Sequence, residues 1–271
     1  MGNGKVRGVG VAMAMQGSSI AGVDVGGADI KLNEDGSYTL ALGCTDMGTG
    51  CDTILSQMAA DVLHVSTDEI FVSGADTDNS PYDSGSYASS TTYITGQAVV
   101  KACTELERRI CKLAALMMEC DEEDVELEGH QVCNIKTGRS VTTEEVGFKA
   151  QSFNDFALQV TESHTSPVSP PPYMAGAVEI ELDKATGHVE VLDYASVIDC
   201  GTVVNPNLAT VQAEGGLGQG IGMTLYENIQ YTEKGQMINN SFMQYRSRQE
   251  EIMDRYVWNS DQAMNRRDHL V

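Results

Sequence analysis

The sequence GSYASSTTYITGQAVV, residues 85–100, is a loop rich in Gly, Ser and Thr that continues directly into a helical pattern. At a helix start the first backbone N–H groups lack partners within the helix, and the helix dipole favours negative charge there. The stretch therefore predicts an anion-binding loop at the start of a long helix over residues 92–118. An apolar stripe at helical spacing follows the loop, formed by Ala98, Ala102, Leu106, Ile110 and Leu113.

The charge of the chain limits the kinds of ligand that this loop could bind. The 271 residues include 17 Lys and Arg against 39 Asp and Glu, a formal net charge of -22 at pH 7. Such a chain lacks the basic surface that nucleic-acid binding requires, so no nucleic-acid partner is expected. An anion held here must rely on neutral hydroxyl and N–H donors, which favours a phosphate-bearing cofactor enclosed by the fold.

The order of the predicted strands and helices is typical of an α+β protein. An apolar run over residues 5–15 predicts a buried strand, and residues 28–42 predict a hairpin. A helix is expected to follow Asp52, which would cap it. The pattern Thr142-x-x-Glu145 is a capping box that begins a short helix. The expected fold class is α+β, with mixed sheets and helices packed on one face.

A proline-rich segment divides the chain. Residues 165–172 read TSPVSPPP, and three consecutive prolines favour an extended connector over a regular element. The expected organisation is a first sub-domain over residues 1–164 and a second over 173–246, with an atypical tail over 247–271. The second sub-domain contains a helix with several glycines between residues 215 and 222, which predicts close packing or the close approach of a ligand.

Motifs for metal binding and for covalent catalysis are missing from the sequence. Its 7 cysteines include no CxxC pair, so no zinc or iron–sulfur site is expected, and reduced thiols in a cytoplasmic protein are favoured. The 5 histidines are scattered and form no ligand pair. No apolar run approaches the length of a membrane span, so no membrane partner is expected. No catalytic or metal-binding residue is assigned from these motifs.

Three neutral stretches are candidate ligand sites, and each has a structural alternative. The turn at 47–49 has glycines beside it that would let a ligand approach the backbone, although an ordinary strand-to-helix turn has the same pattern. The hydroxyls at 88–91 could hold phosphate or only cap the helix. The amide of Gln212, on the helix that begins at Asn205-Pro206, could bind a heterocycle edge or lie on the surface. The candidates are Met47, Gly48, Thr49, Ala88, Ser89, Ser90, Thr91 and Gln212.

Longer blocks of sequence carry a resemblance to a known family. They are KVRGVG (5–10), GCTDMGTGCDT (43–53), DTDNSPYDSGSYASSTTYITGQAV (76–99), YMAGAVEIELDKATGHVEVL (173–192) and DCGTVVNPNLATVQAEGGLGQGIGMTL (199–225). In the order and spacing of these blocks, the chain resembles the molybdenum-cofactor-binding subunit of the xanthine dehydrogenase/aldehyde oxidase family. The resemblance implies an enzyme that hydroxylates a carbon of an aldehyde or N-heterocycle with oxygen from water. Electrons would pass through 2Fe-2S clusters to FAD on partner domains or subunits.

The same resemblance implies a role for each candidate. Met47, Gly48 and Thr49 would line the pterin of molybdopterin. Its phosphate side would be held by Ala88, Ser89, Ser90 and Thr91. Gln212 would bind the cofactor near the metal, and Ile20 falls where the family has a substrate-facing residue. The resemblance also implies two related molybdopterin-binding sub-domains, a small-molecule substrate and an oligomeric enzyme.

Two departures from the family pattern affect what the chain is expected to do. Better-known members have Gln where this chain has Thr49, so one amide contact to the cofactor is lost or replaced. The catalytic glutamate of the family lies in a GxGE motif, which these 271 residues lack. The chain is therefore expected to be a central fragment that is inactive alone, retains no cofactor by itself and self-associates through exposed apolar surface.

The sequence leaves several alternatives open. A non-catalytic pterin- or nucleotide-binding module and a purely structural fragment are both compatible with the blocks. Purine, aldehyde, nicotinate and acyl-thioester oxidisers share them, so the substrate is open. The nucleotide form of the pterin is open too, although bacterial relatives often carry the cytosine dinucleotide form.

Overall fold

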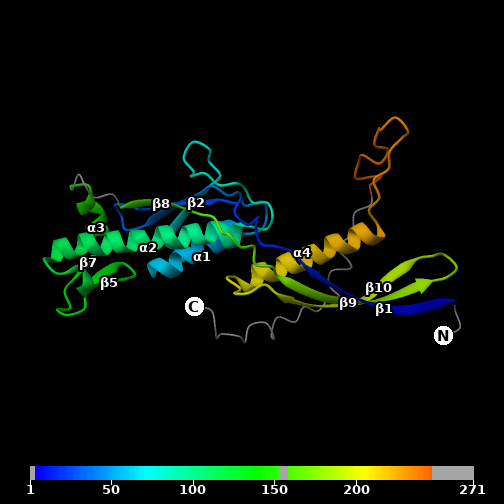
Figure 1. Ribbon diagram of the computed structural model, residues 1–271, viewed down its shortest axis with the longest axis horizontal. Coiled ribbons are helices and arrows are strands. Elements are labelled where there is room, and N and C mark those ends of the chain that lie inside the picture. The colour runs from blue at the N-terminus through cyan, green and yellow to red at the C-terminus, as the bar shows by residue number, and fades with distance from the viewer. Residues whose placement is uncertain (1–3, 153–157, 246–271) are drawn as a thin grey trace. The chain divides into compact units, whose positions relative to one another are not determined.

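The computed structural model describes residues 4–152 and 158–245. The chain forms two compact units (Figure 1). One unit is continuous, from Gly17 to Pro170, and the other joins the residues that precede it to those from Pro171 onward. The atypical tail expected over 247–271 lies outside the described residues.

The continuous unit is built on a four-stranded sheet with the order β4-β3-β2-β8. Strand β2 (Gly26–Leu32) pairs antiparallel with β3 (Tyr38–Leu42), as the predicted hairpin requires, and with β8 (Gln159–His164). Strand β3 pairs parallel with β4 (Ile70–Gly74). Buried and less buried residues alternate along β3, so one face of the sheet forms the core.

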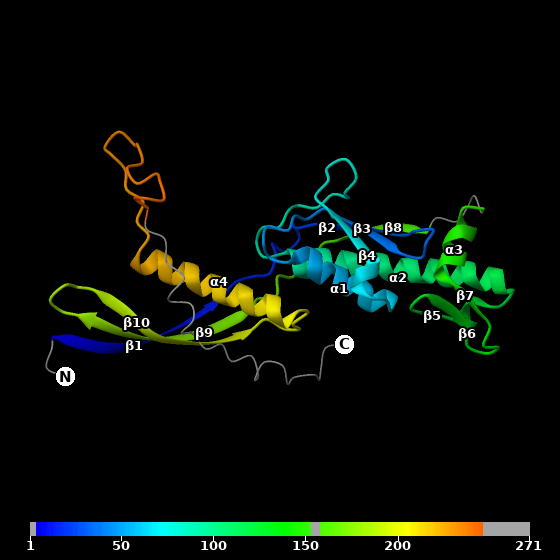
Figure 2. The ribbon, with the colours of Figure 1, turned by 180° about the vertical axis from the view of Figure 1, so that it is seen from behind.

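Two helices, α1 (Cys51–Leu63) and α2 (Thr91–Met118), lie side by side against one face of this sheet (Figures 1 and 2). This arrangement confirms the α+β class with helices on one face. The start of α1 differs from the prediction, because its N-cap is Gly50 and Asp52 lies within the first turn. The stripe predicted for α2 is confirmed, since each of its residues is fully buried: Ala98, Ala102, Leu106, Ile110 and Leu113.

A small antiparallel sheet lies beside the C-terminal part of α2. It consists of β5 (Val125–Glu128), β6 (Gln131–Asn134) and β7 (Ser140–Thr142) and leads into the short helix α3 (Thr143–Ala150). The predicted capping box is present, because the Thr142 hydroxyl accepts a hydrogen bond from the N–H of Glu145 and the Glu145 carboxylate accepts one from the N–H of Thr142.

The other unit contains an antiparallel sheet with the order β1-β9-β10 and one long helix. The strands are β1 (Lys5–Met15), β9 (Tyr173–Asp183) and β10 (Val189–Asp199). Helix α4 (Pro206–Leu225) begins as predicted, with proline in its first turn and the Asn205 side chain accepting a hydrogen bond from the N–H of Leu208 at 3.1 Å.

Strand β1 departs from the prediction in two ways. The apolar run predicted a buried strand, but every residue of β1 is exposed, because β1 lies at the sheet edge and no described residue covers its outer face. Met13, for example, is 80 % exposed. The strand also pairs with β9 along its whole length, so residues 5–15 join the second unit rather than the expected first sub-domain over 1–164.

Candidate cofactor-binding site

The loop that precedes α2 lies directly against the sheet backbone, at the end where β2 begins and β3 finishes. A Cβ at Gly27 would collide with the carbonyl oxygen of Tyr82, and one at Gly43 would collide with that of Pro81. Glycine is therefore required at both positions for the loop to approach this closely. The result is a loop, residues 81–90, that crosses the ends of two neighbouring strands.

The carboxylate of Asp83 fastens this loop to both β2 and α2. Its Oδ1 accepts a hydrogen bond from the N–H of Gly85 at 2.8 Å, and its Oδ2 accepts from the hydroxyl of Thr95 at 2.9 Å and from the N–H of Gly27 at 3.3 Å. Ser84 adds hydrogen bonds to the backbone of Val25, at 3.0 and 3.2 Å. The loop is thus positioned by side chains that belong to it and not by the helix alone.

The start of α2 has an uncommon backbone conformation. Ala88 and Ser89 are left-handed, with φ of 53° and 55°, which non-glycine residues rarely adopt and which clusters at functional sites. Ser90 differs from the expectation that its hydroxyl would face phosphate, because that hydroxyl is buried and donates to the carbonyl of Tyr87 at 2.9 Å. Within the described structure, the N-terminus of α2 therefore has no side-chain cap, and its N–H groups suit an anion.

A second loop, the one that carries Met47, Gly48 and Thr49, is organised by Asp46. Its carboxylate accepts hydrogen bonds from the N–H groups of Gly48 at 2.9 Å, Gly50 at 3.1 Å and Asp52 at 3.4 Å. Burial alone would raise the pKa of Asp46, but these backbone hydrogen bonds outweigh it and lower the pKa below the ordinary value. Asp46 rather than Asp52 thus stabilises the start of α1.

The second loop presents an open apex and is joined to the first. Met47 is 64 % exposed, and no described atom lies within 4 Å of where a Cβ of Gly48 would stand. The hydroxyl of Ser86 accepts a hydrogen bond from the N–H of Thr45 at 3.2 Å and donates one to its carbonyl at 2.9 Å. The backbone at Gly48 is therefore accessible to a ligand, and the two loops are held together at their base.

A third segment, the turn that carries Ile20, is joined to the same loop by Asp24. The Asp24 carboxylate is buried and accepts hydrogen bonds from the N–H of Ile20 and from the hydroxyl of Tyr87, both at 2.7 Å. Ile20 itself is 46 % exposed. The structure thus brings together three of the predicted stretches, those of Ile20, Met47–Thr49 and Ala88–Thr91, through hydrogen bonds within one unit.

Sequence reasoning did not single out the residues that make these connections. Asp24, Asp46 and Asp83 are each followed two positions later by glycine, and this Asp-x-Gly pattern is typical of turns in which the carboxylate binds the backbone. Asp46 and Asp83 do form such turns, with Gly48 and Gly85. Asp24 does not, because its partners lie in the preceding turn and in a distant loop, which no local pattern reveals.

One cluster in this region has ligand atoms close enough for a metal ion. The ligand atoms of Asp46, Cys51 and Asp52 lie within 4.8 Å of one another. Both oxygens of Asp46 already accept backbone hydrogen bonds, and Cys51 is buried. The cluster is accounted for by its role at the start of α1, and no metal site is assigned to it.

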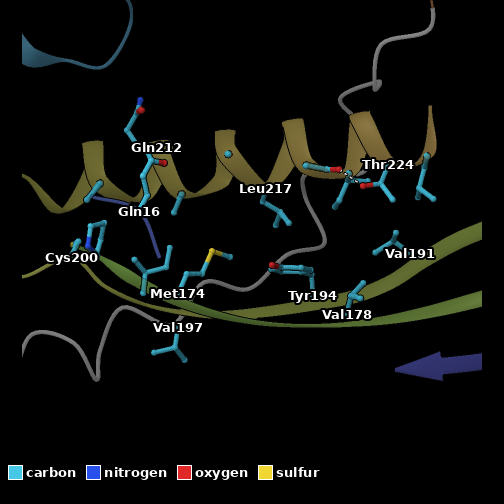
Figure 3. A pocket seen from close by; sticks show the side chains of 18 of the residues that line it. Gln16, Met174, Val178, Val191, Tyr194, Val197, Cys200, Gln212, Leu217 and Thr224 are labelled. Atoms are coloured by element: carbon cyan, nitrogen blue, oxygen red, sulfur yellow. Dashed lines mark hydrogen bonds between the residues drawn. The ribbon is translucent and has the colours of Figure 1, made fainter. Parts of the chain in front are cut away.

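Gln212 lies on α4, in the other unit, at a pocket between that helix and the strands β9 and β10 (Figure 3). The pocket has a volume of about 1150 Å³ and is lined mainly by apolar side chains such as Met174, Val178 and Leu217. Gln212 is exposed, as the surface alternative requires, and shares one end of the pocket with Gln16 and Cys200 (Figure 3).

Three of the glycines of α4 do not pack closely within this unit, whereas Gly222 is buried. No described atom outside the helix backbone lies within 4 Å of where a Cβ of Gly215, Gly216 or Gly220 would stand. Close packing, one of the two explanations offered by the sequence, is therefore not observed at these three glycines among residues 4–152 and 158–245. The same residues include no helix with both the length and the apolar character that a membrane span needs.

Known proteins share both the sequence and the fold. The chain is 34 % identical over 239 residues to "Probable hypoxanthine oxidase XdhD" of Escherichia coli (strain K12), covering 88 % of this chain and 25 % of that protein. It is 33 % identical over 230 residues to the nicotine 6-hydroxylase large subunit of Paenarthrobacter nicotinovorans, covering 81 % and 28 %. The chain thus spans about a quarter of the length of these curated relatives.

The crystal structure of quinoline 2-oxidoreductase from Pseudomonas putida 86 superposes with a TM-score of 0.81 at 26 % identity, over 94 % of this chain and 34 % of that one. Residues 1–248 match the molybdopterin cofactor-binding domain family. The match includes the loops at Ile20, Met47 and Ser89 as well as Gln212. The chain therefore belongs to the molybdopterin cofactor-binding domain family, found in the molybdenum-binding subunits of molybdenum hydroxylases.

Proposed function

We propose that this chain is the cofactor-binding part of a xanthine dehydrogenase-like molybdenum hydroxylase that oxidises an N-heterocycle or an aldehyde. The observation that carries the proposal is the joining of three loops at the uncapped N-terminus of α2, where Asp24, Asp83 and Ser86 hold them together. Relatives named for hypoxanthine, nicotine and quinoline support an N-heterocycle as the substrate.

The residues present fit a phosphate-bearing pterin. Left-handed backbone at Ala88 and Ser89 precedes the first N–H groups of α2, which the N-cap side chain does not cap, an arrangement that suits phosphate oxygens without any Lys or Arg. The open backbone at Gly48 would let the flat pterin approach, with Met47 and Thr49 beside it. When bound, the molybdenum cofactor would supply the redox centre for hydroxylation by oxygen from water.

The proposed function also includes roles for Gln212, for Ile20 and for partner subunits. Gln212 would donate or accept a hydrogen bond at the cofactor near the metal, and Ile20 would face the substrate. Partner domains or subunits would carry the 2Fe-2S clusters and FAD, in an oligomeric cytoplasmic enzyme. The pterin would be in the cytosine dinucleotide form. Two relatives are named as subunits of larger enzymes, which supports the partner subunits.

We assign no catalytic base within the chain. Hydroxylation needs a base within hydrogen-bond reach of the attacking oxygen. The GxGE motif that would supply a glutamate does not occur in these 271 residues. The chain alone should therefore turn over no purine or aldehyde with a dye acceptor, and it should retain no molybdopterin.

The decisive experiment analyses the intact native enzyme that contains this chain. Elemental analysis should find molybdenum, and denaturation should release a fluorescent pterin. Pterin without molybdenum or turnover would favour a non-catalytic pterin-binding module instead. The absence of both would refute the proposal and leave a structural role.

A further inference from the structure

The buried carboxylate of Asp24 has two partners that belong to different segments of the chain. It is 1 % exposed, accepts the N–H of Ile20 on Oδ2 and accepts the hydroxyl of Tyr87 on Oδ1, both at 2.7 Å. Each oxygen has one donor, and the two donors are 67 residues apart in the chain. Both hydrogen bonds are short, so the carboxylate ties the two segments to each other.

We infer that Asp24 and Tyr87 are a positioning pair, which sets the turn that carries Ile20 against the loop that carries Ala88 and Ser89. The inference rests on the proposed function for what these two segments bind, the substrate and the phosphate side of the cofactor. Neither Asp24 nor Tyr87 needs to touch substrate or cofactor for this role. Through this pair, a displacement of one segment would displace the other.

The place of Tyr87 in the loop distinguishes its positioning role from that of the residues that attach the loop to the sheet and to α2. The loop already has its own anchors, with Asp83 bonded to Thr95 and Ser84 bonded to Val25. Tyr87 lies beyond these anchors and immediately before the left-handed residues Ala88 and Ser89. Loss of its hydroxyl would leave the Asp83 hydrogen bonds in place and remove the connection to Asp24 next to the left-handed residues.

The Ile20 turn is constrained in a similar way. Its own backbone closes it, because the carbonyl of Ile20 accepts hydrogen bonds from the N–H groups of Val23 at 3.1 Å and Asp24 at 3.2 Å. The turn is also tied at Gly22, whose N–H donates to the carbonyl of Ser166 at 2.7 Å. The carboxylate of Asp24 connects this closed turn with Tyr87. The hydrogen bond to Asp24 also raises the pKa of Tyr87 above its ordinary value.

The first test uses the full chain and hydrogen–deuterium exchange. Tyr87→Phe removes the donor and leaves the ring, and Tyr82→Phe is the matched control, because Tyr82 lies in the same loop and is 75 % exposed. We expect Tyr87→Phe to speed exchange about tenfold both at the Ile20 amide and at the amides of residues 88–90, while Tyr82→Phe leaves them unchanged. Unchanged exchange at Ile20 in Tyr87→Phe would overturn the coupling.

Asp24→Asn is a second variant that keeps the shape of the side chain. An amide can accept from only one of the two donors on its oxygen and would face the other with an N–H group. It should therefore speed exchange in the same two segments as Tyr87→Phe, and the double variant should add little. Additive effects would show that the two residues act independently, against the inference.

The second test measures kinetics in the holoenzyme. Tyr87→Phe should raise KM about tenfold with kcat changed less than about twofold and molybdenum content unchanged, because the substrate-facing turn is displaced while the redox centre remains. An unchanged KM in an enzyme whose exchange has changed would refute the role in positioning. A wild-type enzyme without cofactor would refute the proposed function instead, and the exchange results would still decide the coupling.

Discussion

The hydroxyl of Thr95, in the second turn of α2, donates a hydrogen bond to the carboxylate of Asp83 at 2.9 Å, so one side chain joins the loop of residues 81–90 to its helix. The same carboxylate accepts the N–H groups of Gly27 and Gly85. Asp83→Ala would leave three donors without an acceptor, and we expect it to lower the free energy of unfolding by about 2–3 kcal/mol. Chemical denaturation of the chain measures this.

Asp78→Ala is the control for that change. Asp78 is exposed and lies five residues earlier in the same connection between β4 and α2. Its replacement should change the free energy of unfolding by less than about 0.5 kcal/mol. Equal effects of the two substitutions would show that the Asp83 hydrogen bonds do not stabilise the loop.

The open face of α4 predicts a stabilising substitution. Gly216→Ala adds a methyl group where no described atom lies within 4 Å and raises helix propensity, so the chain should gain about 1 kcal/mol. Gly187→Ala, in the turn between β9 and β10 with a φ of 74°, should destabilise the chain instead. Unfolding curves of both variants measure these changes in stability.

Close approach of the cofactor to Gly216 predicts a further effect in the holoenzyme. Gly216→Ala should then lower the molybdenum content, which elemental analysis measures.

A negative charge at Ser89 should prevent cofactor retention. Ser89 has a φ of 55°, which Asp and Asn tolerate better than most other non-glycine residues, so Ser89→Asp and its neutral isostere Ser89→Asn should both fold. The added carboxylate would repel phosphate at the start of α2. We expect at least a tenfold loss of bound pterin in the holoenzyme for Ser89→Asp alone. Equal pterin content in both variants would contradict a phosphate site here. Ser90, which is buried, is the poorer position for this test.

Gln212→Leu should lower activity more than stability. Gln212 is exposed in this chain, so an apolar side chain of similar volume should change the melting temperature little. An amide that binds the cofactor would lose its hydrogen bonds, and kcat/KM of the holoenzyme should fall by about tenfold or more. A lower melting temperature with full specific activity would support the surface alternative.

The exposed face of β1 should cause the chain to self-associate. Val11 and Met13 are 75 % and 80 % exposed on an edge strand, and such apolar surface promotes association. Val11→Lys combined with Met13→Lys should reduce the apparent mass in light scattering after gel filtration. Ile135→Lys, at a residue 58 % exposed in the other unit, is the control and should have no effect. A wild-type chain that remains monomeric at high concentration would contradict the prediction.

Much of the local structure follows from the sequence because its causes lie within a few residues. The buried stripe of α2, the capping box between Thr142 and Glu145 and the start of α4 at Asn205 depend on helical periodicity and on side chains that bind nearby N–H groups. The candidate loops could be found for the same reason, since glycines and hydroxyls beside a helix start form a local pattern. The local pattern alone predicted an anion site, and the resemblance to a family predicted the molybdenum cofactor as its ligand.

Other features depend on residues far apart in the chain, and only the tertiary structure determines them. The apolar pattern of β1 is the same whether the strand is buried or at an edge. Its pairing with β9 places it at the edge of the sheet β1-β9-β10. Asp24 has one partner nearby, the N–H of Ile20, but its other partner, the hydroxyl of Tyr87, lies 63 residues away and joins two loops. Local sequence specifies backbone conformation over a few residues, whereas burial and side-chain partners arise only when distant segments pack together.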